Sequence, residues 1–546
     1  MVYCGKASQG CQNCRTRRIK CDKKRPECSQ CIRVGKKCPG YRDQLSLMFR
    51  DESSKVIQKA HAQWGSGSPT DATGSSSLAS SSSSASTWTQ ESPASSSSSG
   101  TGSPLADGSV TPRDLTPARI PRKVDMNVDQ QGLQFYISRY LMNHPDSPKT
   151  RDQLAAYFSS ADAAQNVMVA VGLAGMSNLL GNKNMNLHAR SKYVAALKQT
   201  GQLIASNNPA GFIARVRSVV TLALFEVVQG KGPRGTVGSA STHINGAVAV
   251  LRSVLPLPHA PNGGAPGVLQ LLYSSFIPYH MMESPLPPSF FETLEFCKQL
   301  MRDVPEGCSV DLGLAIARLL QLLKITEHTI LTDERPTTND LIQQFLQLDD
   351  VLDSLESKLS EAFPYSQNQG EYPPEAVFRG KWHKYNEVWG ARIWNHYRWA
   401  RILGIQRLVK FMADCPISCS RIISTQQRTI CFITVERLAE DILVSTPSHW
   451  HHPMLGREDT EKFEADGMGN SGAVGVPSLL WHLTVAGCAP NVPPEYWEWA
   501  NNVLLVIWKQ MGMKHAFALS ELMEEHRIRL DKKLIKQEVK LEGEDL

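Results

Sequence analysis

The sequence of 546 residues contains no long run of apolar residues. Its two most apolar stretches, near 167–175 and 219–228, are shorter than the roughly 20 residues that a membrane-spanning helix needs. The first six residues also lack the apolar segment of a secretory signal. The sequence therefore argues against a secreted protein and against a membrane protein, and we expect no membrane partner.

The sequence also lacks the HExxH, GxSxG and Walker-type motifs of common enzyme classes. Two segments match Gly-x-Gly-x-x-Gly, at 230–235 and 467–472, but neither has the preceding strand and following acidic residue that a dinucleotide site needs. We interpret both as loops between helices, and we interpret the histidines at 449–452 in the same way. We predict that the protein is not an enzyme and has no catalytic residues.

Acidic residues are scarce in the first 50 residues, which hold three of them against 13 Lys and Arg. This segment therefore has a formal charge of +10, whereas the whole chain has +6. The remaining 496 residues sum to −4. All of the positive excess lies in the first tenth of the chain, and a charge of this density favours contact with nucleic acid phosphates.

A segment of low complexity follows this basic region. Residues 66–103 include 18 serines in 38 positions, and four prolines lie in 104–121. Such a composition cannot bury enough apolar surface to offset the entropy of ordering the chain. We therefore predict a linker at 46–123, disordered from about residue 66, between a first domain at 1–45 and a second at 124–546.

The second domain has the apolar periodicity of helices. Leu133, Tyr136, Ile137, Tyr140 and Leu141 share one helix face. Further runs of this kind occupy 154–180, 193–204, 212–228, 247–254, 269–282, 312–325, 341–363, 382–412, 430–444, 496–513 and 516–539. Little of the region alternates with period two. The predicted fold class is a small cysteine-rich module, a disordered linker and a large all-α domain.

Six of the cysteines form a regular pattern near the N-terminus. They are Cys11, Cys14, Cys21, Cys28, Cys31 and Cys38. The second three repeat the spacing of the first three after a shift of 17 residues. Zinc takes four such ligands in a tetrahedron, so six thiolates fill one site with two to spare, or two sites if two thiolates bridge. The repeat favours two Zn²⁺ ions per chain, and we interpret Cys4 as a free thiol outside the pattern.

A family resemblance appears at residues 10–38, in the string GCQNCRTRRIKCDKKRPECSQCIRVGKKC. Its spacing and its basic residues resemble the binuclear-cluster domain of fungal Zn2Cys6 transcription factors. The resemblance implies two short helices, related by a pseudo-dyad, that share two zinc ions. It also implies that Cys11 and Cys28 bridge the two metals and that Pro26 turns the loop between the halves.

Basic residues fill the first half of the pattern. Arg15, Arg17, Arg18 and Lys20 lie between the second and third cysteines, and Lys23 and Lys24 follow. Two zinc ions and six thiolates together lower the local charge only to about +8. The resemblance implies that Arg17 and Arg18 read CGG-like triplets in the major groove. We assign Arg15, Lys20, Lys23 and Lys24 to phosphates.

The stretch 189–253 is similar to the helical regulatory region that follows the cluster in many of these fungal regulators. We therefore expect a nuclear, zinc-dependent, sequence-specific transcription factor of the RNA polymerase II type, which regulates metabolic or specialised-metabolite genes. Its partners would be double-stranded DNA and the transcription machinery or co-regulators. The alternative is a zinc-stabilised docking module on a helical scaffold. Apolar residues at 45–64 give at most two poor heptads, fewer than a stable coiled coil needs. A homodimer is possible, but the sequence does not establish one.

Overall fold

The computed structural model describes residues 11–17, 19–22, 27–39, 126–142, 144, 147–148, 150–158, 162–205, 212–257, 260–464 and 475–544. The chain divides into two units, Met1–Thr116 and Pro117–Leu546. The predicted linker at 46–123 and the apolar residues at 45–64 lie outside the described residues, as does Cys4. The domain boundaries at 45 and 123 stay predictions.

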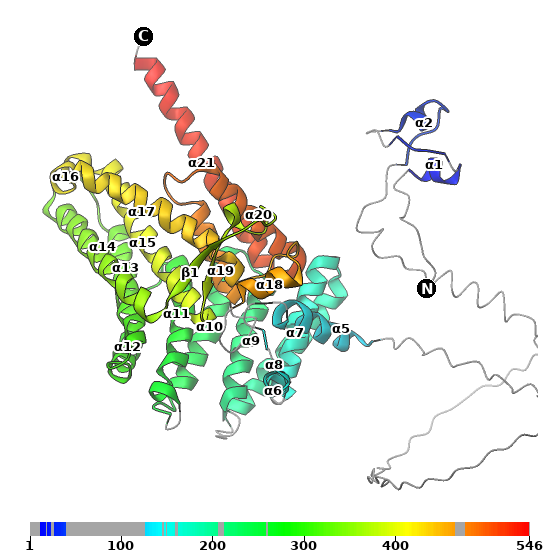
Figure 1. Cartoon of the computed structure of the whole chain (residues 1–546), viewed down its shortest axis with the longest axis horizontal. Helices are drawn as coiled ribbons and strands as arrows, with labels where there is room; N and C mark the ends of the chain where they lie inside the picture. Colours follow the sequence, from blue (N-terminus) through cyan, green and yellow to red (C-terminus); the bar gives the residue numbers. More distant parts are fainter. Residues whose placement is uncertain are drawn as a thin grey trace, which may run out of the picture. The chain divides into compact units, whose positions relative to one another are not determined.

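The second unit is largely helical (Figure 1), which confirms the predicted fold class. Its first helices are α5 (Val128–Tyr136), η1 (Ile137–Leu141), α6 (Arg151–Phe158), α7 (Asp162–Leu180), α8 (Lys183–Ala205), α9 (Phe212–Gln229), α10 (Pro233–Arg252), η3 (Pro261–Gly264), α11 (Ala265–Met281) and α12 (Pro288–Leu300). The later ones are η4 (Pro305–Gly307), α13 (Cys308–His328), α14 (Pro336–Ala362), η5 (Phe378–Gly380), α15 (Val388–Asp414), α16 (Pro416–Ile422), α17 (Thr425–Val444), η6 (Thr446–Ser448), α18 (Arg457–Phe463), α19 (Gly475–Gly487), α20 (Pro494–Met511) and α21 (Lys514–Glu544). None of the described helices is long and apolar enough to cross a membrane.

Helix α7 packs closely against α5 because glycines face each other at the crossing. A Cβ atom at Gly172 would lie 1.8 Å from the carbonyl oxygen of Gly132, so no larger residue fits without separating the helices. Helix α7 also packs against α8 and α9. Its buried residues lie on all sides, which explains its nearly continuous apolar sequence.

Helix α15 lies at the centre of the later half, where it packs against α13, α14, α17 and α19. Tyr397, Arg398 and Trp399 are consecutive and fully buried, so the helix has no solvent-facing side at this level. Arg398 donates hydrogen bonds to the Tyr385 hydroxyl at 3.0 Å and to Asn395 Oδ1 at 2.9 Å. Both bonds come from Nη1, and Asp441 Oδ2 lies 3.7 Å from Nε as the nearby opposite charge that a buried cation requires.

A two-stranded hairpin interrupts the helical pattern. Strands β1 (Tyr365–Gln369) and β2 (Lys381–Tyr385) are antiparallel, with Tyr365 opposite Tyr385. The expected helix over 382–412 is therefore wrong at its start, since α15 begins at Val388. The aromatic residues of β2 favour a strand, but its partner strand is mostly polar and shows no alternation. The sequence also missed α12, α16, α18 and α19.

Of the motifs interpreted as loops, the histidines at 449–452 lie in a connection, whereas the Gly-x-Gly-x-x-Gly segment at 230–235 runs into α10. Gly230 and Gly232 have positive φ and form the turn between α9 and α10, so a helix and not a strand precedes this Gly-x-Gly-x-x-Gly segment. The turn is shorter than the composition suggested, because α10 already begins at Pro233. The segment 467–472 lies outside the described residues. His449 follows η6 and is buried, with its Nε2 2.9 Å from Asn395 Nδ2.

Asp349, Asp353 and Glu356 form an acidic row on α14, and this row forms ion pairs with neighbouring helices. Arg401 of α15 lies 2.9 Å from Asp349 Oδ1, 2.7 Å from Asp353 Oδ1 and 3.3 Å from Glu356 Oε2. Arg437 of α17 reaches the other oxygen of Glu356 at 2.7 Å. The row therefore joins three helices within the fold.

Replacing Arg401 by methionine should lower the free energy of unfolding by about 3 kcal/mol or more, because Arg401 is 5% exposed and its loss removes the cation that pairs with Asp349, which is 24% exposed. The matched control is Arg421→Met, since Arg421 pairs with Glu334 at 2.7 Å but both side chains are more than half exposed. That change should cost less than about 1 kcal/mol. Urea unfolding followed by tryptophan fluorescence measures both. Equal losses for the two variants would contradict the central role of Arg401.

Candidate metal centre and nucleic-acid interface

Two short helices of the first unit position four of the six cysteines. Helix α1 (Gln12–Thr16) begins directly after Cys11 and contains Cys14, and α2 (Ser29–Ile32) begins after Cys28 and contains Cys31. One helical turn therefore brings the two thiols of each Cys-x2-Cys pair to the same side. The Cys14 N–H donates to Cys11 Sγ at 3.5 Å. The two helices contact each other.

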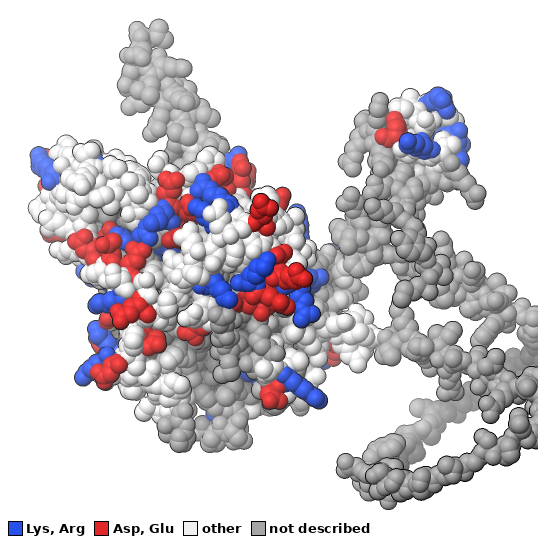
Figure 2. Space-filling view, viewed as in Figure 1, with Lys and Arg blue, Asp and Glu red and all other residues white. Residues whose placement is uncertain are grey.

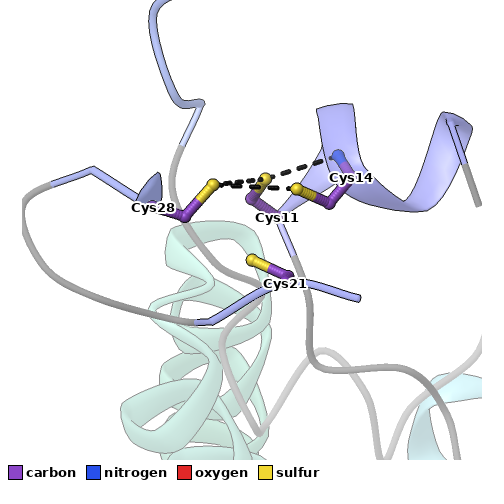
Figure 3. A group of neighbouring side chains, drawn as sticks. All are labelled: Cys11, Cys14, Cys21 and Cys28. Atoms are coloured by element: carbon purple, nitrogen blue, oxygen red, sulfur yellow. Dashed lines mark hydrogen bonds between the residues drawn. The ribbon is translucent and has the colours of Figure 1, made fainter. Parts of the chain in front are cut away.

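The six cysteines form two groups of four that share two members. Cys11, Cys14, Cys21 and Cys28 form one group, shown in Figure 3, and Cys11, Cys28, Cys31 and Cys38 form the other. Within each group all sulfur atoms lie within 4.8 Å of one another. A shift of 17 residues converts Cys11, Cys14 and Cys21 into Cys28, Cys31 and Cys38, and each group is completed by the first cysteine of the other half. Among the described residues, these are the groups with the spacing of metal ligands.

The sulfur distances match tetrahedral zinc coordination. Cys11 Sγ lies 3.7 Å from the sulfurs of Cys28 and Cys31, and Cys14 Sγ lies 3.7 Å from that of Cys28. Four sulfurs at about 2.3 Å from one zinc ion lie about 3.8 Å from each other. The six cysteines form no disulfide bonds among the described residues, and these separations are far longer than the roughly 2 Å of such a bond.

Burial makes this arrangement dependent on a cation. Cys11, Cys14, Cys28 and Cys31 are almost completely buried. Burial raises the pKa of the Cys11 thiol to about 12 and also raises the pKa of Cys28. A coordinated divalent cation reverses this effect, because a thiol that binds a metal is deprotonated. The donor set therefore fits zinc well.

The backbone repeats with the same shift of 17 residues. After α1, the Ile19 N–H donates to the Cys14 carbonyl at 3.0 Å, and after α2 the Lys36 N–H donates to the Cys31 carbonyl at 3.1 Å. Asn13 connects the two halves, since its Nδ2 donates to the Lys37 carbonyl at 3.1 Å and lies 3.6 Å from Cys31 Sγ. The internal repeat of the sequence is thus a structural repeat.

Two of the three acidic residues in this region stabilise the module. Asp22 accepts hydrogen bonds from the Ser29 N–H at 3.1 Å and the Ser29 hydroxyl at 2.5 Å, at the start of α2. Glu27 accepts from the Cys38 N–H at 3.1 Å. Sequence reasoning counted these acids only as charges, and it missed them and Asn13. A carboxylate seven residues before a helix start carries no local capping signal, because chain folding brings it there.

The basic residues that the structure describes are exposed. Arg17 and Lys20 in the first half are exposed, and so are Arg33, Lys36 and Lys37 in the second. Figure 2 shows basic side chains on the surface of this unit. The side chain of Arg15 and the residues Arg18, Lys23, Lys24 and Pro26 lie outside the described part. The second half was not among the predicted DNA contacts, yet three of its cations are also exposed.

Comparison with known proteins identifies this module. The family model of the fungal Zn(2)-Cys(6) binuclear cluster domain matches residues 9–47. A stretch of 37 residues is 51% identical to part of the "Aspercryptin biosynthesis cluster-specific transcription regulator atnN" of Emericella nidulans. This similarity covers 7% of the chain and 6% of that regulator, and no solved structure matches. Residues 9–47 therefore belong to the fungal Zn(2)-Cys(6) binuclear cluster family, whose domain binds two zinc ions.

Proposed function

We propose that the protein is a zinc-dependent, sequence-specific DNA-binding transcription regulator. The observation that carries the proposal is the pair of four-cysteine groups sharing Cys11 and Cys28, in a module whose described basic side chains are exposed. An exposed cation-rich surface of this size suits a DNA groove. The similarity of 37 residues to a transcription regulator supports the same function.

In this proposal the six cysteines hold two zinc ions, with Cys11 and Cys28 as bridging ligands and Cys14, Cys21, Cys31 and Cys38 as terminal ligands. Cys11 and Cys28 belong to both four-cysteine groups, whereas each of the other four cysteines belongs to one group, which supports the assignment of bridging and terminal ligands. The metals supply folding energy and neutralise the thiolates. The exposed side chains of the module perform recognition, because five of the six cysteines are buried and Cys21 is half-buried.

Arg17 and Arg18 read the bases of CGG-like triplets, and Arg15, Lys20, Lys23 and Lys24 contact phosphates. A guanidinium can donate two parallel hydrogen bonds to O6 and N7 of guanine in the major groove. Arg17 directly follows α1, and its side chain is exposed. Lys20 is exposed three residues further along.

This division of roles predicts different effects of two substitutions. Arg17→Ala should weaken binding to a CGG duplex about tenfold more than binding to a scrambled duplex, because it removes about 1–3 kcal/mol of base discrimination. Lys20→Ala should weaken binding to both duplexes equally and reduce the slope of log K against log salt by about one. Fluorescence anisotropy of the full chain with labelled duplexes measures both quantities. Uniform weakening by both variants would contradict the division between base and phosphate contacts.

The helical domain acts as the regulatory or effector domain, and the protein works in the nucleus. The proposed targets are metabolic or specialised-metabolite genes, which is supported by the relative's description as specific for a biosynthesis cluster. This role needs no catalytic residues. The test of the overall proposal is DNA binding by the full chain before and after zinc removal with a chelator. Binding that persists unchanged without zinc would contradict it.

A further inference from the structure

The helical domain contains a cavity of about 440 Å³ that the proposed DNA-binding function does not use. Its residues come from α9, α10 and α11 on the one hand and from α15, α19 and α21 on the other. Cavities that hold small ligands in proteins typically measure about 300–1,000 Å³. The size therefore suits one small organic molecule.

The walls of this cavity are mainly apolar. Helices α9, α10 and α11 contribute aliphatic side chains, among them Val220, Leu224, Val237, Ile244, Leu271 and Ile277. Water in such a space finds few hydrogen-bond partners along these walls. Apolar surface of a ligand would be buried favourably there.

Besides polar residues such as Arg217, Ser241 and Ser274 of α9, α10 and α11, the lining includes polar groups of the other three helices. Ser478 Oγ and Trp481 Nε1 of α19 and His515 Nδ1 of α21 belong to residues that line the cavity. All three are buried atoms without a hydrogen-bond partner among the residues that the structure describes. Buried polar atoms of this kind cost free energy until a partner satisfies them. The Trp481 N–H can only donate, so its missing partner is an acceptor.

A positive charge lies in the same lining. Arg392 of α15 donates from Nη2 to the Ser274 hydroxyl at 2.9 Å, and both residues line the cavity. Its charge acts on the surroundings, since it adds to burial in lowering the pKa of His449 to about 3. The electrostatic potential near this side of the cavity therefore favours an electron-rich group.

We propose that this cavity binds a small, mostly hydrocarbon molecule that carries one hydrogen-bond acceptor such as a carboxylate or carbonyl. The hydrocarbon part lies against α9, α10 and α11, and the acceptor faces Ser478, Trp481 and Arg392. The bound molecule joins two sets of helices that are far apart in the sequence. The proposal goes beyond DNA binding and does not depend on it.

The test uses the zinc-loaded full chain and the fluorescent probe 8-anilinonaphthalene-1-sulfonate, which has an aromatic body and an anionic group. We expect saturable binding near one probe per chain, and displacement by 2-naphthoate. Val220 lines the cavity and is half-buried, so a larger side chain there should fill the cavity. We expect Val220→Trp to lower the affinity for the probe at least tenfold. Circular dichroism and the urea midpoint establish that this variant is folded.

A second variant tests the acceptor. Trp481→Phe keeps an aromatic ring but removes the N–H, so 2-naphthoate should bind roughly 3–10-fold more weakly and naphthalene less than twofold more weakly. Trp508→Phe is the matched control, because Trp508 does not line this cavity, and it should change neither affinity. Absence of probe binding, or equal binding by folded Val220→Trp, would overturn the proposal. Equal losses for 2-naphthoate and naphthalene in Trp481→Phe would overturn the assignment of the acceptor.

Discussion

Replacing Cys11 by serine is expected to remove both zinc ions from the chain. Cys11 is a member of both four-cysteine groups and is fully buried, so its loss leaves each group with three thiols. Structural zinc contributes on the order of 10 kcal/mol or more to the folding of small metal modules. The module should therefore lose its fold, and DNA binding by the full chain should fall below detection.

The measurement combines zinc content by mass spectrometry with alkylation of cysteines. In Cys11→Ser, zinc should fall from two ions per chain to none, and the normally buried Cys14 and Cys31 should react quickly with iodoacetamide. Cys21→Ser should have a milder effect, because Cys21 belongs to one group only. Cys488→Ser, in the helical domain, is the control and should retain both ions. Retention of two ions by Cys11→Ser would refute its shared position.

The helical domain is expected to lose stability steeply as the pH falls from about 6.5 towards 4. Burial lowers the pKa of His396 to about 4, that of His449 to about 3 and that of His515 to about 4. An unfolded chain binds protons at these histidines below about pH 6.5, whereas the folded domain does not. At pH 5 each of them should cost about 2 kcal/mol of stability. Above about pH 6.5 these histidines are neutral in both states, so the domain has its full stability there.

Buried carboxyl groups oppose this trend in part. Burial raises the pKa values of Asp349, Glu387 and Asp441, so the folded domain takes up protons there as the pH falls. The histidines are more numerous, because burial also lowers the pKa of His280 to about 4 and that of His383 to about 2. The free energy of unfolding therefore decreases as the pH falls.

Urea unfolding of the full chain at pH 7.5, 6.0 and 5.0, followed by tryptophan fluorescence, measures this slope. The urea midpoint should fall at each step. In His515→Leu the total fall between pH 7.5 and 5.0 should be smaller, because one of the buried histidines no longer contributes to it. His188→Leu is a suitable control, because the side chain of His188 is 43% exposed. A midpoint that stays constant from pH 7.5 to 5.0 would show that the buried histidines are not kept neutral by the fold.

The sequence predicted features that depend on local spacing. The pattern from Cys11 to Cys38 indicated two metal sites with a twofold repeat, and the structure places the six sulfurs in two groups related by that repeat. Apolar periodicity also located most long helices, such as α9 and α13, within a few residues. Both signals arise from neighbouring residues, so a single sequence contains them.

Features that depend on contacts between distant residues were not predicted. Asn13 contacts the Lys37 carbonyl 24 residues away, and Arg401 joins an acidic row some 50 residues away. The sequence predicts helix where strand β2 lies, because the polar partner strand gives no alternating pattern. The cavity is likewise assembled from six helices. Such arrangements follow from how the helices pack, which a periodic pattern does not specify.

Sequence-specific DNA binding is tested most directly by comparing the affinity of the zinc-loaded full chain for two duplexes of equal length and composition. One contains CGG triplets and the other has them scrambled, and fluorescence anisotropy at fixed salt gives both dissociation constants. We predict a preference of at least about tenfold for the CGG duplex, because each bidentate arginine–guanine contact contributes about 1–3 kcal/mol. Equal affinities would contradict sequence-specific DNA binding and favour a zinc-stabilised docking module.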